Sequence, residues 1–198
     1  VISDNNSKDR TAEIGKQLAE ENEAVDYVFV PEQGKGSAVI EVWKRFKADI
    51  YGFMDADLAT DLNALRPALE AIKENDIAVG SRRIKGAQVQ RELYRKFTSA
   101  VLNFLIRMIL RTKIRDTACG FKFFKHEVID KILPQIKDRK WTFDTEILIL
   151  AERAGFKIKE IPVKWEEKQE RTSKIVPVPT ILGYLRKILE LKRRKQKT

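Results

Sequence analysis

Short apolar runs alternate with helical patterns along residues 1–83, and this alternation limits the fold of the chain more than any other feature. Strand-like runs occupy residues 1–3, 27–30, 49–54 and 76–83, and helical spacing marks the stretches between them, at residues 12–23, 37–47 and 62–74. In the last of these helices the spacing directs Leu65, Leu69 and Ile72 inward. Strands that alternate with helices indicate βα units, so we expect an α/β fold with a mostly parallel sheet flanked by helices.

The second half of the chain opens with its longest helical pattern, at residues 93–111. A strand at residues 121–124 follows, and then helices at residues 128–136 and up to residue 154. Residues 157–165 read as a strand that Pro162 interrupts, and because proline donates no backbone hydrogen bond we expect an edge strand. We expect a main domain over residues 1–178 and a basic amphipathic C-terminal helix or tail over residues 179–198.

Composition limits the possible partners and compartments of the protein. The formal net charge of +10 indicates an anionic partner, which can be nucleic acid, a phosphorylated ligand or a membrane surface. The single cysteine, Cys119, excludes an intramolecular disulfide and fits a reducing compartment. The most apolar window, residues 97–110, is shorter than the roughly 20 residues that a membrane span needs. Because the chain starts at Val1, almost inside a strand, we expect that an N-terminal piece is missing.

Two carboxylates, Asp55 and Asp57, follow the apolar strand at residues 49–54. Residues two apart in an extended segment point the same way, and ligands of open α/β sheets bind beyond the carboxyl ends of strands. Paired carboxylates form a hard oxygen site that suits Mg²⁺ or Mn²⁺ carrying a diphosphate. The alternative for an isolated Asp-x-Asp is a solvated acidic turn.

Two further segments are candidates for binding anions. The loop Gly34-Lys35-Gly36 opens a helix whose N-terminus can receive phosphate, although a tight turn explains the same residues. Arg95, Ser99 and Asn103 are each four residues apart, so they form one polar line along the helix at residues 93–111. A solvated helix face is the alternative interpretation of that line.

Several motifs recur in the same order in one known family. They are Asp4-Asn5-Asn6-Ser7-Lys8-Asp9-Arg10-Thr11, Gly34-Lys35-Gly36, Asp55-Ala56-Asp57-Leu58-Ala59-Thr60-Asp61-Leu62, Gly80-Ser81-Arg82, Arg115-Asp116-Thr117-x-Cys119-Gly120-Phe121-Lys122, Trp141-x-Phe143-Asp144-x-Glu146 and Ser173-Lys174-Ile175-Val176-Pro177. Over residues 1 to about 178 the chain resembles the family 2 inverting glycosyltransferases of the GT-A fold, in their polyprenyl-phosphate branch. The Trp-x-Phe-Asp-x-Glu form favours the dolichyl-phosphate glucosyltransferases over the mannosyl type.

The resemblance implies a Rossmann-like GT-A sheet and the transfer of a sugar, glucose from UDP-glucose, to a polyprenyl (dolichyl) phosphate with inversion. It also implies Mg²⁺ or Mn²⁺ as cofactor and a peripheral location on the cytoplasmic face of a membrane. By the same resemblance Asp55 and Asp57 hold the metal, and Arg82 adds a second cation at the diphosphate. Asp57, Arg95 and Asp144 are the residues that it implies for catalysis.

The resemblance also implies roles in substrate binding. Arg95 and Ser99 lie where family members receive the acceptor phosphate, and Arg171 and Lys174 would close over the phosphates. By the same resemblance, Asp4 is expected to contact the base and Lys35 to contact the donor. Asp144 and Glu146 are expected to contact sugar hydroxyls or the nearby cations.

The sequence departs from the family at two places. The family's first strand, with its Pro-x-Tyr-Asn-Glu segment, is expected before Val1, and the first loop has Asp4-Asn5-Asn6 where relatives often carry two Asp and a Gly. A mannose donor or a non-lipid acceptor is the nearer alternative function. A nucleic-acid-binding α/β module is the distant one, because the basic residues form no known reader motif and do not alternate with aromatic residues.

Overall fold

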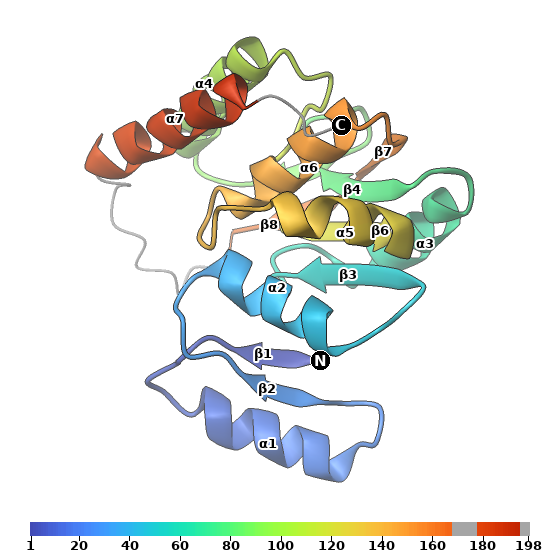
Figure 1. The fold of residues 1–198 in the computed structure, drawn as a ribbon. Coiled ribbons are helices and arrows are strands. Elements are labelled where there is room, and N and C mark those ends of the chain that lie inside the picture. The colour runs from blue at the N-terminus through green and yellow to red at the C-terminus, as the bar shows by residue number, and fades with distance from the viewer. Residues whose placement is uncertain (168–177, 195–198) are drawn as a thin grey trace.

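The computed structural model describes residues 1–167 and 178–194, with the backbone alone at residues 95 and 178–182 (Figure 1). The elements in chain order are β1 (Ile2–Asp4), α1 (Thr11–Glu21), β2 (Tyr27–Phe29), α2 (Lys35–Arg45), β3 (Ile50–Met54), α3 (Leu65–Glu74), β4 (Ile77–Ser81), β5 (Gln88–Gln90), α4 (Leu93–Leu110), β6 (Phe121–Lys125), α5 (His126–Ile132), α6 (Phe143–Arg153), β7 (Ile158–Pro162), β8 (Lys164–Glu166) and α7 (Val178–Arg193). The predicted alternation of strands and helices is confirmed.

The central sheet has four strands in the order β3-β6-β4-β7. β4 and β7 are parallel, whereas β6 is antiparallel to both of its neighbours, so β3, β4 and β7 share one direction. Phe121, where β6 begins, lies opposite Met54, where β3 ends. The chain therefore stays at the carboxyl end of the sheet after β4 and enters β6 from that end. The expected α/β fold with mostly parallel strands is confirmed; the reversed β6 was not expected.

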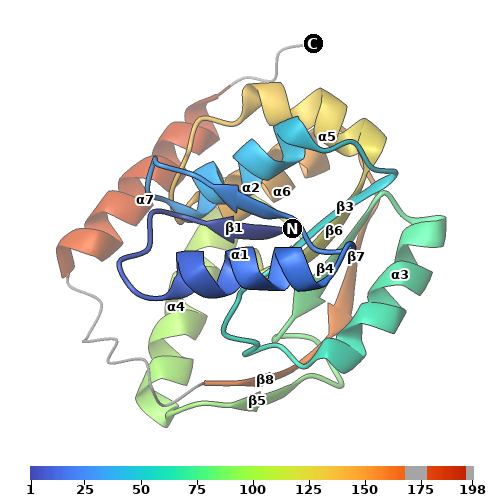
Figure 2. The same cartoon turned by 90° about the horizontal axis from the view of Figure 1, so that it is seen from below.

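Two smaller parallel pairs accompany this sheet, β1 with β2 and β5 with β8. β7 pairs with β4 alone among the described strands, so the expected edge position of the strand with Pro162 is confirmed. Directly after it, β8 pairs with β5 and Trp165 forms a bridge with Thr60 (Figure 2 shows β5 and β8 side by side). The β5–β8 pair thus ties the edge of the sheet to the loop that carries Asp57.

Helices cover both faces of the sheet (Figure 1 and Figure 2). Successive residues of β4 point to opposite faces, so Ile77 and Val79 join one core with α2, α5 and α6, while Ala78 joins a second core under α3. The inward direction of Leu65 and Leu69 was wrong, because α3 packs through Ala68 and Ile72, together with Ala64 just before it, and leaves these leucines 41% and 40% exposed. Small side chains allow the close approach of α3 that bulky leucines would prevent.

The C-terminal helix α7 packs beside α4 (Figure 1). Its Ile188 and Leu191 are 0% and 3% exposed and belong to the main core, and Arg153 donates a 2.9 Å hydrogen bond to the carbonyl of Leu191. The segment that we expected as a basic amphipathic C-terminal helix or tail is a helix up to Arg193, and its Ile188 and Leu191 lie in the main core. Among the described residues no helix is both long and apolar enough to cross a membrane.

Candidate active site

A cavity of about 720 Å³ opens beyond the carboxyl ends of β3 and β4. Several elements that are distant in the sequence form its walls, namely the loops after β3 and β4, the start of α2, the middle of α4, the start of α6 and part of α7. It brings together seven of the side chains that the sequence indicated, which are Lys35, Asp55, Asp57, Arg82, Ser99, Asn103 and Asp144.

The acidic loop turns sharply at the cavity wall. The backbone N–H of Asp55 donates to the carbonyl of Gly120 at 3.1 Å, and the backbone N–H of Leu58 donates to the carbonyl of Asp55 at 3.2 Å. Leu58 has a left-handed backbone conformation, with a φ of 51°. Asp57 accepts a hydrogen bond from the N–H of Ala59 at 3.1 Å. Both carboxylates line the cavity, which favours a binding role over the alternative of a solvated turn.

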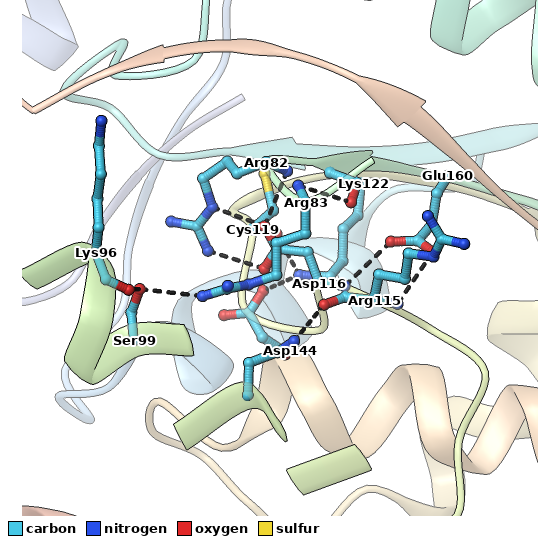
Figure 3. A network of polar contacts seen from close by, with 12 residues as sticks. Arg82, Arg83, Lys96, Ser99, Arg115, Asp116, Cys119, Lys122, Asp144 and Glu160 are labelled. Carbon is cyan, nitrogen blue, oxygen red and sulfur yellow. Dashed lines mark hydrogen bonds and ion pairs between the residues drawn. The ribbon is translucent and has the colours of Figure 1, made fainter. Parts of the chain in front are cut away.

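Asp144 lies between two lysines at the base of the cavity. Lys35 Nζ is 2.8 Å from Asp144 Oδ2 and 2.9 Å from Asp55 Oδ1, while Lys122 forms an ion pair with the other oxygen of Asp144 and donates to the carbonyl of Cys119 (Figure 3 shows Lys122 and Asp144). Burial lowers the pKa of Lys35, but the carboxylates of Asp144 and Asp55 outweigh it and raise the pKa above its ordinary value. Lys35 is therefore a permanent cation of this site.

Lys122 is a residue that the sequence reasoning missed. It is fully buried in β6, and the signals that could have found it are its place at the end of the Arg115–Lys122 motif and inside the apolar run Phe121-Lys122-Phe123-Phe124. Asp144 does not cap α6, because its carboxylate binds the two lysines. The carboxylate of Asp138 accepts the N–H groups of Thr142 and Phe143 at the start of α6.

The glycines around Lys35 serve packing. The N–H groups of Gly36 and Ser37 at the start of α2 donate to the carbonyls of Lys140 and Arg139 at 3.3 and 2.9 Å. A Cβ atom at Gly34, which has a φ of 145°, would overlap the carbonyl of Arg139. These amides are already paired, so the structure favours the tight turn over phosphate binding by this helix N-terminus.

Arg82 and Asp116 form a bidentate ion pair on the wall of the same cavity (Figure 3). Arg82 Nε and Nη2 lie 2.7 and 2.9 Å from the two carboxylate oxygens of Asp116, and the guanidinium carbon is 5.4 Å from the centre of the Trp165 ring. Burial raises the pKa of Asp116, but the bonds from Arg82 outweigh this and hold the pKa below its usual value. Glu160 fixes the loop by accepting the N–H groups of Arg115 and Asp116 at 3.0 Å.

A second, basic cavity of about 340 Å³ adjoins the first, since both are lined by Arg82, Arg83, Arg91, Ser99 and Trp165. Lys96 lies on its wall as well, and Arg83 Nη2 donates to Ser99 Oγ at 3.0 Å (Figure 3). The sequence indicated Ser99 and Arg82, but it did not single out Arg83, Arg91 or Lys96. These three cations come together only when β5 and α4 fold against the loop after β4.

The other predicted residues lie elsewhere. Asp4 is 1% exposed, accepts hydrogen bonds from the N–H of Ser7 and the hydroxyl of Tyr27 at 2.9 and 2.8 Å, and is not on the cavity wall. Glu146 faces away from the cavity, where it accepts the N–H of Lys137 at 3.0 Å and pairs with Arg194. Their predicted contacts with base and sugar stay predictions. The side chains of Arg95, Arg171 and Lys174 lie outside the described residues.

The fold is that of the GT-A glycosyltransferases. Glucosyl-3-phosphoglycerate synthase from Mycobacterium tuberculosis, crystallised with Mn²⁺, UDP-glucose and phosphoglyceric acid, superposes on 96% of this chain and 67% of its own with a TM-score of 0.65 at 14% identity. The same enzyme with UDP alone gives a TM-score of 0.63 at 15% identity over 96% of this chain and 67% of its own. Residues 1–133 match the family model "Glycosyl transferase family 2", and the chain belongs to this family.

Similar proteins come from both archaea and eukaryotes. The chain is 34% identical over 192 residues to glycosyltransferase AglD of Haloferax volcanii, which is 96% of this chain and 30% of that protein. It is 33% identical over 174 residues to a dolichyl-phosphate beta-glucosyltransferase of Trichomonas vaginalis, which is 84% of this chain and 54% of that protein. The yeast dolichyl-phosphate beta-glucosyltransferase is 32% identical over 193 residues, with 84% of this chain and 56% of the yeast protein covered. The predicted family is confirmed, and the chain spans about half the length of the dolichyl-phosphate relatives.

Proposed function

We propose that the protein transfers a sugar from a nucleotide diphosphate sugar to a polyprenyl phosphate, with UDP-glucose and dolichyl phosphate as the donor and acceptor. The observation that carries the proposal is one continuous site with an acidic wall at Asp55 and Asp57 and a basic wall at Arg83, Arg91 and Lys96. Such a site suits a reaction between two phosphorylated substrates. The names of the glucosyltransferase relatives support the choice of sugar and acceptor.

Asp55 and Asp57 fit a divalent metal that binds together with the donor. Both offer hard carboxylate oxygens at the cavity, as Mg²⁺ and Mn²⁺ prefer. In residues 1–167 and 178–194 no group of three or more His, Cys, Asp or Glu side chains forms a complete metal cage, so oxygens of the diphosphate and water would complete the coordination. When bound, the metal would neutralise charge that develops on the departing nucleotide. Lys35, beside Asp55, would contact the same diphosphate.

The basic cavity is the proposed site of the acceptor phosphate. A phosphate oxygen is already anionic at neutral pH, so the acceptor needs no strong general base in order to attack the sugar. The negative charges of the two substrates repel each other. Arg83, Arg91 and Lys96 would reduce this electrostatic repulsion, and Ser99 would orient the phosphate. Arg82 stays fixed by Asp116 between the two cavities. Attack from the side opposite the leaving diphosphate inverts the anomeric carbon.

The acceptor's long apolar tail suggests that the protein works on the cytoplasmic face of a membrane as a peripheral protein. α4 exposes an apolar face next to the site, with Phe97, Phe104 and Met108 exposed by 70%, 58% and 63%. Leu102 and Ile106, on the cavity side of the same helix, line the site. A lipid tail that leaves the basic cavity along α4 would thus meet apolar surface.

Sugar transfer from labelled UDP- and GDP-sugars to a polyprenyl phosphate tests the proposal, with Mg²⁺ or Mn²⁺ and detergent present. We expect a lipid-linked product from UDP-glucose, its loss with EDTA and in Asp57→Ala, and normal transfer in the exposed control Asp130→Ala. The result that overturns the proposal is hydrolysis of a donor without any transfer to lipid phosphate. A product from GDP-mannose instead would favour a second candidate, since a dolichol-phosphate mannosyltransferase of Pyrococcus furiosus is 32% identical over 195 residues.

A further inference from the structure

A lysine already occupies one of the two carboxylates at the donor end of the cavity. Lys35 Nζ lies 2.9 Å from Asp55 Oδ1 and 2.8 Å from Asp144 Oδ2, and the Lys35 side chain is only 13% exposed. The Asp55 side chain is 37% exposed and lines the cavity. A cation that binds at Asp55 therefore meets the ammonium group of Lys35 at that carboxylate.

The two carboxylate contacts of Lys35 differ in how easily a ligand can replace them. Asp144 is buried and has a second partner in Lys122, whose side chain is 0% exposed. The ammonium group also lies 5.0 Å from the centre of the Phe53 ring. On its other side Lys35 reaches Asp55, which faces the open cavity. Lys35 is thus anchored at Asp144 and can turn away from Asp55 without losing every partner.

We propose that Lys35 is an internal counter-ion, which occupies Asp55 in the free protein and moves to the donor diphosphate when the metal and the nucleotide bind together. The inference rests on the proposed function and adds an order of binding to it. Two cations at one carboxylate repel each other. A diphosphate offers the displaced ammonium a new partner, so the metal alone binds weakly and the nucleotide strengthens its binding. By linkage the metal strengthens nucleotide binding by the same factor.

Titration with Mn²⁺, followed by the paramagnetic resonance signal of the free ion, tests this without any turnover. In the absence of nucleotide we expect Lys35→Met to bind Mn²⁺ about tenfold more tightly than the unchanged protein, because the competing charge is gone. Lys35→Arg keeps the charge and should not bind more tightly. Lys73→Met is the matched control, since Lys73 also pairs with a carboxylate, Glu70 at 2.8 Å, but far from the cavity on α3. With UDP present, the advantage of Lys35→Met should disappear.

Equal or weaker Mn²⁺ binding by Lys35→Met, in a protein that melts as the unchanged one does, would overturn the inference. Lys35→Gln repeats the measurement if the methionine variant does not fold. The proposed function fails separately. If Mn²⁺ binding is absent in every variant even with UDP, or survives Asp57→Ala, the metal site itself is wrong. If Mn²⁺ binding depends on Asp57 but not on Lys35, only the proposed role of Lys35 as a counter-ion is contradicted.

Discussion

Gly120 lies so close to Asp55 that a Cβ atom at this position would overlap the carboxylate oxygen Oδ2. The carbonyl of the same glycine accepts the backbone N–H of Asp55 at 3.1 Å. The loop before β6 thus positions Asp55, the proposed metal ligand, through a glycine that has no functional side chain. The glycine of the Thr-x-Cys-Gly segment is required for space, which the sequence pattern alone does not explain.

Substitution of Gly120 by alanine should therefore displace Asp55. We expect Gly120→Ala to lower sugar transfer on the order of 100-fold, since a displacement of about 1 Å at a reacting centre can cost that much. Gly183→Ala in α7 is the control, because a Cβ atom there meets nothing within 4 Å. Comparison of transfer rates with melting temperatures separates a displaced carboxylate from an unfolded protein. Normal transfer by Gly120→Ala would show that Asp55 tolerates the shift.

Cys119 gives a second prediction for a single residue, this time on pH. The thiol is fully buried, and burial raises its pKa from 9.0 to about 11. The folded state therefore favours the neutral thiol, so its contribution to stability is complete below pH 9 and is lost as the pH rises towards 11. We expect the free energy of unfolding in urea to fall by about 2 kcal/mol over this range through Cys119. In Cys119→Ala the fall should be smaller by that amount, and an equal fall in both proteins would contradict the prediction.

Among the elements, α7 is the one whose position in the structure differs most from the expectation based on the sequence. Its sequence predicted a basic amphipathic helix or tail at the surface, but one side of the helix is buried against α4 and the main core. Tyr184 brings it to the active site, because its hydroxyl lies 2.8 Å from Thr145 Oγ1, next in sequence to Asp144. The helix thus supports the wall of the cavity.

Two neighbouring residues of α7 test this placement. Ile188 is 0% exposed and Leu189 is 43% exposed. Ile188→Ala should destabilise the protein by about 2–5 kcal/mol, as expected for a cavity in a packed core. Leu189→Ala should change the free energy of unfolding by no more than about 0.5 kcal/mol. Urea unfolding of both variants measures the difference, and equal small effects would mean that α7 is not packed on the core in solution.

The whole molecule combines a formal charge of +10 with an exposed apolar face on α4, two features that favour an anionic membrane surface. Removal of α7 cannot test this, since it would also remove core residues. The double variant Phe97→Ser/Phe104→Ser can, and we expect it to lower flotation with anionic liposomes at least about tenfold by the loss of apolar contact. Leu65→Ser/Leu69→Ser on α3 is the control, because these leucines are also partly exposed. Equal flotation of both double variants would exclude α4 as the contact surface.

The sequence by itself determined the order of strands and helices except for β5 and the division of residues 157–165 into β7 and β8. It also determined the edge position of the strand with Pro162 and the acidic pair at the end of β3. These are local properties, because periodicity and turn residues act over a few positions. Only the tertiary structure decided the reversed β6, the inward side of α3, the position of Glu146 away from the cavity and the burial of α7. The tertiary structure also decided which charged residues pair with each other in the site. Asp144 and Lys122 are 22 positions apart, and Arg82 and Asp116 are 34 apart. A buried charge must find its partner in space, and no local pattern in the chain records which residue will stand there.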